Sequence, residues 1–290
     1  MPDSQPLRQD SSNSPTGLQS KAYLDTTVVA NALLRSDQIG QRSVEAIRRF
    51  DVAEMPEYAI KEFKAGPLSG WIWCHNKFNE TRSLADTIAA INSISATPRR
   101  NFSASARQAF EQPTKTDQAS FAQVLDLGQH AEPILDKALA DRYRLYLRRR
   151  ITQAWQRRRS IATKVSMPLL CFIEGELETD SGGGLHFERY SCPRDSDCSV
   201  FAELCKRGDA VGRILAALEN QGDKPENQKR YQALRHIVRT PKRGFSDNKC
   251  RDLGDAVFAI MAPPDSIILT TNIKDHGPLA SALGKVALEP

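Results

Sequence analysis

The stretch KAYLDTTVVA, residues 21–30, constrains the fold more than any other part of the chain. Its first half reads as a buried strand, yet Asp25 places an acid where that strand would end. A second strand-like run near the C-terminus, DSIILTTN, ends in a similar way at Asn272. In an open α/β sheet, functional groups lie at the carboxyl ends of the strands. The two runs therefore predict an α/β protein with Asp25 and Asn272 at that edge.

The segments around the first run predict a compact N-terminal block. Residues 1–20 are rich in Ser, Gln and Pro, which is typical of a disordered tail. After it we expect a strand at 22–25, a helix at 37–50, a strand at 51–55, a helix from Pro56 that stops at Gly66, and helices at 67–79 and 80–95.

The middle of the chain has a different character. The polar, breaker-rich stretch after Pro98 predicts a loop or linker. An apolar stripe then predicts one long helix from Glu132 to about Val165. For the remainder we expect an irregular segment at 166–200, helices at 199–220 and 225–239, one helix over NKCRDLGDAVFAIMA, and the strand in DSIILTTN.

Composition indicates a cytoplasmic protein. No apolar run approaches the roughly 20 residues that a membrane-spanning helix needs, and no signal peptide is evident. The six cysteines are too sparse for a disulfide framework, so we expect reduced thiols and no membrane partner. The formal charge of +5 is unevenly spread, with basic residues gathered in 142–164 and acids in 174–180.

Four acids are the best candidates to meet at one point: Asp25, Glu62, Asp255 and Asp275. Several carboxylates at one place repel one another unless a cation offsets their charge. Oxygen-only ligands favour Mg²⁺ or Mn²⁺ over zinc. Asp252 lies three residues before Asp255 on the same helical face, so the sequence leaves open which of the two points inward.

Four motifs carry a family resemblance, in the order LDTTVVA, PEYAIKEF, GDAVFAIMA and SIILTTNIKDH. This succession resembles the PIN-domain nucleases, including the VapC-like toxins. The resemblance implies a three-layer α/β/α sandwich around a central parallel sheet. It also implies a metal-dependent ribonuclease in which three or four acids bind one or two Mg²⁺ or Mn²⁺ ions.

Carried over by position, the resemblance assigns the first three acids to Asp25, Glu62 and Asp255. The fourth position falls either on Asn272 or on Asp275, and both are taken as metal ligands. His276 stands where members of the family commonly have phenylalanine. Thr26 and Thr270 match hydroxyl residues that often line the site.

The implied chemistry is metal-assisted hydrolysis of RNA phosphodiester bonds, with Asp25, Glu62, Asp255 and Asp275 as catalytic residues. The fold would comprise a PIN-like core from 21–97 and 245–290, divided by a mostly helical insertion at 98–244. That insertion would hold substrate, form a homodimer or receive an inhibitory protein partner. By analogy with the family, the protein would be a bacterial toxin or defence effector.

A run of arginines on the expected long helix predicts a nucleic-acid surface. Interleaved aromatic residues would add stacking faces for single-stranded or structured RNA. Ion pairing and solubility explain such a helix equally well. The residues proposed to bind RNA are Arg148, Arg149, Arg150, Arg157, Arg158 and Arg159.

Simpler interpretations compete at each site. Asp25 or Asp255 could only cap a helix, and Glu62 could be an ordinary solvated residue. His186, Cys192, Cys198 and Cys205 have a spacing that could hold zinc, but they lack a tight C-x2-4-C pair, which favours unliganded thiols.

Two other functions remain as alternatives to a nuclease. A haloacid-dehalogenase-type phosphatase is disfavoured, because such enzymes need an aspartate two residues after the first and position 27 is threonine. A catalytically degenerate PIN-like module that binds RNA or protein stays open, because Asn272 replaces an acid at the fourth position.

Overall fold

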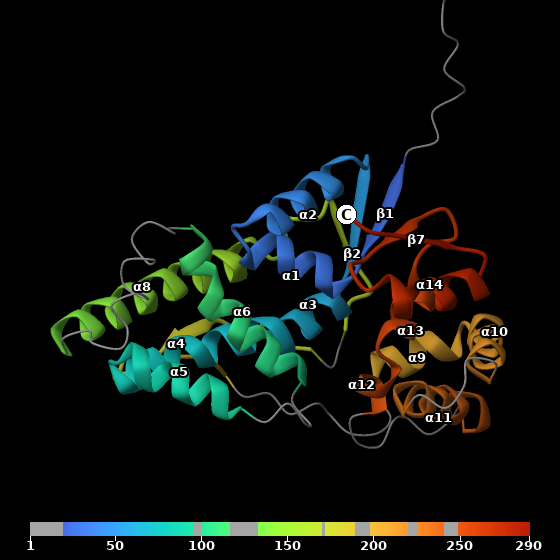
Figure 1. Ribbon diagram of the computed structural model, residues 1–290. Helices are drawn as coiled ribbons and strands as arrows, with labels where there is room; N and C mark the ends of the chain where they lie inside the picture. Colours follow the sequence, from blue (N-terminus) through green and yellow to red (C-terminus); the bar gives the residue numbers. More distant parts are fainter. Residues whose placement is uncertain are drawn as a thin grey trace, which may run out of the picture.

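The computed structural model describes residues 20–94, 100–116, 133–169, 172–188, 198–219, 225–240 and 249–290. A five-stranded sheet lies at its centre, with the strand order β3-β2-β1-β6-β7 (Figure 1). All four strand pairs are parallel. The strands are β1 (Lys21–Leu24), β2 (Val52–Pro56), β3 (Lys164–Ser166), β6 (Ile267–Leu269) and β7 (Val286–Leu288). The predicted α/β class with a parallel sheet is confirmed, and helices on both sides make it compatible with a three-layer sandwich.

The order of the strands determines where a site can form. β1 is the central strand, and its residues Ala22, Tyr23 and Leu24 are fully buried, as expected for a strand covered on both faces. The chain leaves β1 towards β2 on one side, while β6 pairs with β1 on the other. The order therefore reverses between β1 and β6. In open α/β sheets ligands bind outside the carboxyl ends of strands at such a switch point.

The N-terminal helices lie close to the predicted ranges, except that the first, directly after Asp25, was expected only in the capping interpretation. They are α1 (Thr26–Leu34), α2 (Gln38–Arg48), α3 (Glu57–Phe63), α4 (Ser69–Thr81) and α5 (Leu84–Ser93). The expected stop at Gly66 is wrong, because the chain continues from α3 through a π-helical turn, η1 (Lys64–Leu68), into α4. Gly66 keeps a helical backbone there, and the wider turn accommodates Pro67, which has no N–H to donate.

The loop expected after Pro98 is also wrong, since α6 (Arg100–Thr116) is a helix packed on α4. Its buried face consists of small residues, among them Ser105, Ala106 and Ala109. A Cβ added to Gly70 of α4 would lie 2.5 Å from the Cβ of Ser105, so the two helices approach very closely. Small residues permit this approach without producing an apolar pattern in the sequence.

The long helix is present as α8 (Pro133–Arg157), and it also packs on α4. The ring of Tyr143 packs against those of Phe78 and Phe110, with centroids 5.2 and 5.4 Å away, and the two phenylalanine rings also contact each other at 6.4 Å. α8 ends earlier than expected, because β3 follows and pairs with β2. The segment proposed as an insertion therefore contributes an edge strand to the central sheet.

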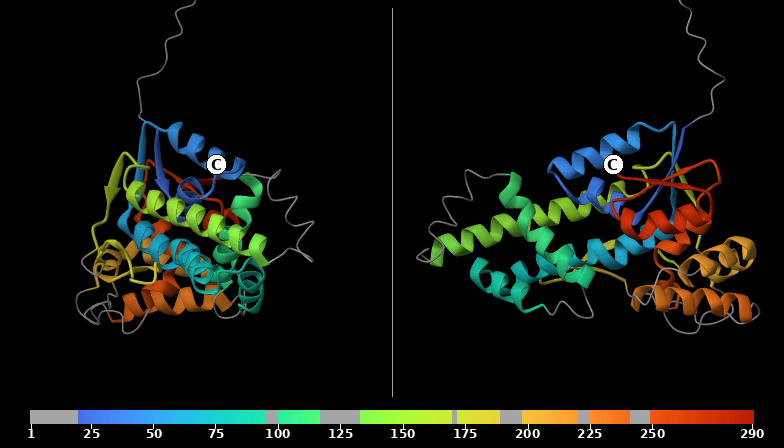
Figure 2. Two further views of the ribbon diagram at one scale, coloured as in Figure 1. Left: turned by 90° about the vertical axis from the view of Figure 1, so that its left-hand side faces the viewer. Right: turned by 45° about the vertical axis from the view of Figure 1, so that its right-hand side comes forward.

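Two groups of helices extend from the sheet. α4, α5, α6 and α8 form one of them, and α9 (Ser199–Cys205), α10 (Gly208–Glu219) and α11 (Pro225–Arg239) form the other (Figure 2). The second group contacts α12 (Lys249–Leu253), α13 (Asp255–Met261) and α14 (Ile273–Ala282). A hairpin of β4 (Leu177–Thr179) and β5 (Leu185–Phe187) lies within 166–200.

The single helix expected over NKCRDLGDAVFAIMA is wrong, because Gly254 separates α12 from α13. Its φ of 45° and ψ of −127° lie in a region that only glycine adopts readily. Of the predicted tail, residues 1–20, all but Ser20 lie outside the described residues. Within the part of the chain that the structure describes, no helix is long and apolar enough to cross a bilayer.

Candidate functional site

Asp25 lies at the carboxyl end of β1, where its side chain is almost completely buried. Its carboxylate accepts hydrogen bonds from the backbone N–H of Thr26 at 2.7 Å and from the hydroxyl of Thr27 at 2.6 Å. The hydroxyl of Thr270, at the end of β6, donates to the same carboxylate at 2.9 Å. Asp25 therefore caps α1, as the simpler interpretation expected, and also joins the ends of β1 and β6.

Glu62 reaches the same place from α3. Its Oε2 accepts a hydrogen bond from the hydroxyl of Thr26 at 2.8 Å. Burial and the negative charges of Asp25 and Asp255 raise the pKa of Glu62 to about 7, although the Thr26 hydroxyl opposes the shift. Glu62 is thus not an ordinary solvated glutamate, and with this pKa it is partly protonated at neutral pH.

Asp255 is the first residue of α13, and the unusual backbone of Gly254 sets its position. Asp255, rather than Asp252, faces Asp25: Asp252 is exposed, whereas one oxygen of Asp255 lies 3.1 Å from Nε2 of His276. That same nitrogen lies 3.5 Å from the carboxylate of Asp25. Asp25, Glu62 and Asp255, here called the acid cluster, therefore converge from three distant segments.

His276 is fully buried between two of these acids. Burial alone would lower its pKa, but contacts with Asp25 and Asp255 outweigh burial and raise the pKa to about 10. Conversely, burial would raise the pKa of Asp25, but His276, Thr27 and Thr270 hold it below its usual value. Neither ring nitrogen has a partner in hydrogen-bond geometry among the described residues. The contacts are therefore ion pairs between an imidazolium and two carboxylates.

Arg230 binds the other oxygen of Asp255, although it comes from α11, within the segment expected to form a separate insertion. Its Nη2 donates to Asp255 at 3.1 Å, and its Nε donates to the carbonyl of Leu253 at 3.2 Å. The sequence analysis missed Arg230 because nothing in the local pattern of α11 shows that it meets α13. His276 was noted only as a replacement for phenylalanine, yet an ionisable residue four positions after Asn272 was a usable signal.

The two candidates for the fourth position contact each other. The side-chain amide of Asn272 donates to Asp275 at 2.9 Å, and its backbone N–H donates to the Thr270 hydroxyl at 2.9 Å. Within the described residues, no hydrogen bond or ion pair joins Asp275 directly to the acid cluster. The structure therefore brings three of the four predicted acids together, whereas Asp275 is linked to Asp25 through Asn272 and Thr270.

A divalent cation fits the acid cluster in chemistry, because three carboxylates supply the hard oxygen ligands that Mg²⁺ and Mn²⁺ prefer. Burial is the largest cause of the raised pKa of Glu62, and repulsion by Asp25 and Asp255 adds to it; such a cation would relieve that repulsion. In the arrangement observed, however, His276 and Arg230 offset the negative charge. No group of three His, Cys, Asp or Glu side chains among the described residues is arranged to hold a metal ion.

The six arginines of the long helix and the turn after it divide into two sets. Arg148, Arg149 and Arg157 are exposed. Arg150 instead donates to the carbonyls of Leu33, Leu34 and Arg35 at the end of α1. Arg158 and Arg159 form ion pairs with Glu174. Half of the predicted nucleic-acid surface is therefore committed to contacts within the protein.

The candidate zinc residues lie apart from the acid cluster in the sequence. His186 forms an ion pair with Glu178 at 3.2 Å on the β4–β5 hairpin, and Cys192 lies outside the described residues. Of the cysteines that the structure describes, Cys74, Cys198, Cys205 and Cys250 form no disulfide. This agrees with the expectation of thiols.

Comparison with known proteins gives no relative. No family model matches the chain, no curated protein matches it, and no solved structure matches it. Any functional statement therefore depends on the geometry of the acid cluster.

Proposed function

We propose that the acid cluster is the active site of a metal-dependent nuclease that hydrolyses phosphodiester bonds of RNA. The observation that supports this proposal is the convergence of Asp25, Glu62 and Asp255 at the switch point between β1 and β6. Glu62 follows Asp25 by 37 positions and Asp255 follows Glu62 by 193, so helix capping alone does not account for their meeting. Buried acids at such an edge are more typical of a functional site than of stability.

The residues in and around the acid cluster have different roles in the proposed hydrolysis. Asp25 and Asp255 would hold a divalent cation, which would supply Lewis-acid activation of the scissile phosphate. Glu62, with its pKa near 7, takes a proton from the attacking water and can return it to the leaving group. Thr27 and Thr270 keep the Asp25 carboxylate in one orientation.

A second function, RNA binding without cleavage, is favoured by one specific observation. His276 and Arg230 already compensate two of the carboxylates, so the acid cluster is stable without a metal ion. A cation at Asp25 and Asp255 would compete with the His276 imidazolium for the same oxygens. If the His276 imidazolium excludes the cation under all conditions, the protein is a binding module.

The two functions are separated by incubating purified protein with labelled single-stranded RNA in Mn²⁺, in Mg²⁺ and in EDTA. We expect cleavage only with a divalent cation, and its loss in Asp25→Asn. The matched control is Asp265→Asn, because Asp265 is exposed, pairs with Lys21 at 2.5 Å and lies before β6, at the opposite end of that strand.

Cleavage that persists unchanged in Asp25→Asn would indicate a contaminating nuclease and would contradict the proposal. RNA binding with no cleavage in any metal would favour the binding module. Calorimetric titration of wild type with Mn²⁺ gives an independent measure, because a nuclease site must bind the cation and a compensated cluster need not.

A further inference from the structure

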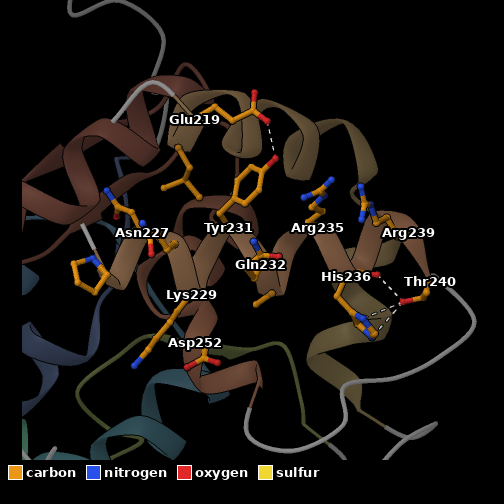
Figure 3. A pocket seen from close by; sticks show the side chains of 14 residues that line it. Glu219, Asn227, Lys229, Tyr231, Gln232, Arg235, His236, Arg239, Thr240 and Asp252 are labelled. Atoms are coloured by element: carbon orange, nitrogen blue, oxygen red, sulfur yellow. Dashed lines mark hydrogen bonds between the residues drawn. The ribbon is translucent and has the colours of Figure 1, made fainter. Parts of the chain in front are cut away.

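A pocket of about 870 Å³ lies outside the acid cluster, along α11, and is also lined by the end of α10 and by Asp252 of α12 (Figure 3). Its volume is within the range of pockets that receive small ligands or segments of larger ones. Four of its lining residues follow one another at intervals of four along α11: Asn227, Tyr231, Arg235 and Arg239. Residues at this spacing form one ridge on a helix, and this set is called the α11 ridge.

The α11 ridge carries two arginines beside an aromatic ring. Arg235 and Arg239 extend on the side of α11 that faces α10, next to Tyr231 (Figure 3). The guanidinium of Arg235 lies 5.9 Å from the centre of the Tyr231 ring. Neither arginine forms an ion pair with a carboxylate within the part of the chain that the structure describes. Both guanidinium groups therefore line the pocket with no carboxylate within ion-pair distance among the described residues.

Tyr231 is fixed by Glu219, the acid that lines that side of the pocket among the described residues. Its hydroxyl donates to Glu219 of α10 at 2.7 Å, which holds the ring in place and engages the carboxylate. The second acid that lines the pocket, Asp252, lies with Lys229 on the opposite side of α11 (Figure 3). The pocket thus presents a fixed aromatic ring and two cationic groups on one wall.

Position on the helix explains only part of this arrangement. Cations near a helix C-terminus interact favourably with the helix dipole, which accounts for basic residues in the last turn of α11. The dipole does not account for a hollow beside them, nor for two like charges four residues apart, which repel each other. A bound anion explains both.

The α11 ridge also leads to the acid cluster. Asn227, at its far end, accepts a hydrogen bond from Nη1 of Arg230 at 3.3 Å. The other terminal nitrogen of Arg230 holds Asp255. From Arg239 to Asn227 the ridge spans about 18 Å along the helix axis, which is long enough for several phosphates of an extended strand.

We propose that the α11 ridge binds single-stranded RNA, with Arg235 and Arg239 on phosphates and Tyr231 against a base, and that the strand continues to the acid cluster. Paired cations and an aromatic ring suit single strands, whose bases are free to stack. Continuation of the RNA strand to the acid cluster depends on the proposed function, whereas RNA binding at the α11 ridge does not. α11 belongs to a segment that the family resemblance did not cover.

The test measures binding of a fluorescein-labelled single-stranded oligoribonucleotide by anisotropy in EDTA, where no metal-dependent cleavage occurs. We expect Arg235→Glu/Arg239→Glu to weaken binding about tenfold or more, and to reduce the slope of log K against log salt by about 1.4, the value for two phosphate contacts on a single strand. The matched control is Arg42→Glu/Arg49→Glu on α2, which makes the same change of charge at two exposed arginines.

A neutral double variant, Arg235→Gln/Arg239→Gln, provides the same test if the charge-reversed variant misfolds. It should lose part of the affinity for RNA. RNA binding equal to wild type in both ridge variants, or equally weakened binding in the α2 control, would overturn the proposal. Binding of AMP that depends on the two arginines while RNA binding does not would also overturn it, because the pocket would then serve a small phosphate compound. Loss of RNA binding in a protein that never cleaves would support the ridge and reject the nuclease.

Discussion

Nε2 of His276, on α14, lies 3.1 Å from the carboxylate of Asp255, on α13. The side chain of His276 is fully buried, and that of Asp255 is largely buried. The contact matters because the same nitrogen also faces Asp25. A buried carboxylate without a cation is costly. The imidazolium therefore stabilises the acid cluster in the absence of metal, and it determines how strongly a metal ion must bind to displace it.

Replacement of His276 by phenylalanine should destabilise the protein without metal. Removing one partner of a buried ion pair typically costs about 3–5 kcal/mol. Phenylalanine has a similar shape and can retain the edge contact with Phe258, whose ring centroid is 5.8 Å from that of His276. Urea unfolding in EDTA measures the loss, and we expect Mn²⁺ to raise the melting temperature more in this variant than in wild type.

The control for His276→Phe is His186→Phe, which removes an exposed ion pair with Glu178. Such pairs contribute at most about 1 kcal/mol, so little change is expected. Equal effects of the two substitutions would mean that His276 is not an ion-pair partner. A melting temperature insensitive to Mn²⁺ in His276→Phe would count against a metal site.

The stability of the protein should decline at alkaline pH in a way that depends on His276. Its pKa is raised from an unfolded value of about 6.5 to about 10 in the folded state. The stabilisation is therefore complete below about pH 6.5 and is lost as the pH rises towards 10. Asp25 has the opposite sign, because its lowered pKa gives stability above about pH 4 that is lost on acidification. Urea midpoints from pH 6 to 10 should fall more steeply in wild type than in His276→Phe.

Substitution of Gly254 by alanine should displace Asp255. The backbone at Gly254 (φ 45°, ψ −127°) costs a residue with a Cβ about 1–3 kcal/mol. Relief of that strain would move the start of α13 and weaken the contact of Asp255 with His276. We expect a loss of stability in urea together with weaker Mn²⁺ binding.

Gly212→Ala is the comparison for Gly254→Ala. Gly212 lies within α10 and an added Cβ meets no atom within 4 Å. Alanine there should stabilise the protein by about 0.4–1 kcal/mol. A Gly254→Ala protein as stable as wild type would show that the break between α12 and α13 is not strained.

The acid cluster could be predicted largely from the sequence because its signals are local. An acid at the end of a strand, as at Asp25, and an acid at the start of an apolar helix, as at Asp255, are visible in a few residues. The orientation of Asp255 over Asp252 could not be predicted, since it depends on a glycine that ends one helix and begins the next. A single helix through both would have placed them on one face.

Other features depend on contacts between distant segments and leave no local pattern. α6 packs through serine and alanine against Gly70, so its buried face looks polar in the sequence. Arg230 reaches Asp255 because α11 lies against α12. Arg150 resembles its neighbours Arg148 and Arg149 in sequence, and only the position of α1 makes it a helix cap.

The arginines of α8 should separate into structural and surface residues. Arg150→Met removes hydrogen bonds from a charged group to three carbonyls, which should cost about 2 kcal/mol of stability with no change in the salt dependence of RNA binding. Arg148→Gln/Arg149→Gln/Arg157→Gln should leave stability within about 0.5 kcal/mol. If α8 contacts RNA, the triple variant reduces the salt slope by about 2. An unchanged slope would restrict RNA binding to the α11 ridge.

Binding of Mn²⁺ to the acid cluster should release protons from Glu62. With a pKa near 7, this carboxyl group is about half protonated at neutral pH, and a cation beside it favours the ionised form. Calorimetric titrations at pH 7 in buffers of different ionisation enthalpy count the protons that leave. Protons from Glu62 should be absent in Glu62→Gln, whereas protons displaced from His276 should remain. A proton count that is the same in wild type and in Glu62→Gln would show that Glu62 is not protonated beside Asp25 and Asp255, and its assignment as the general base would then be wrong.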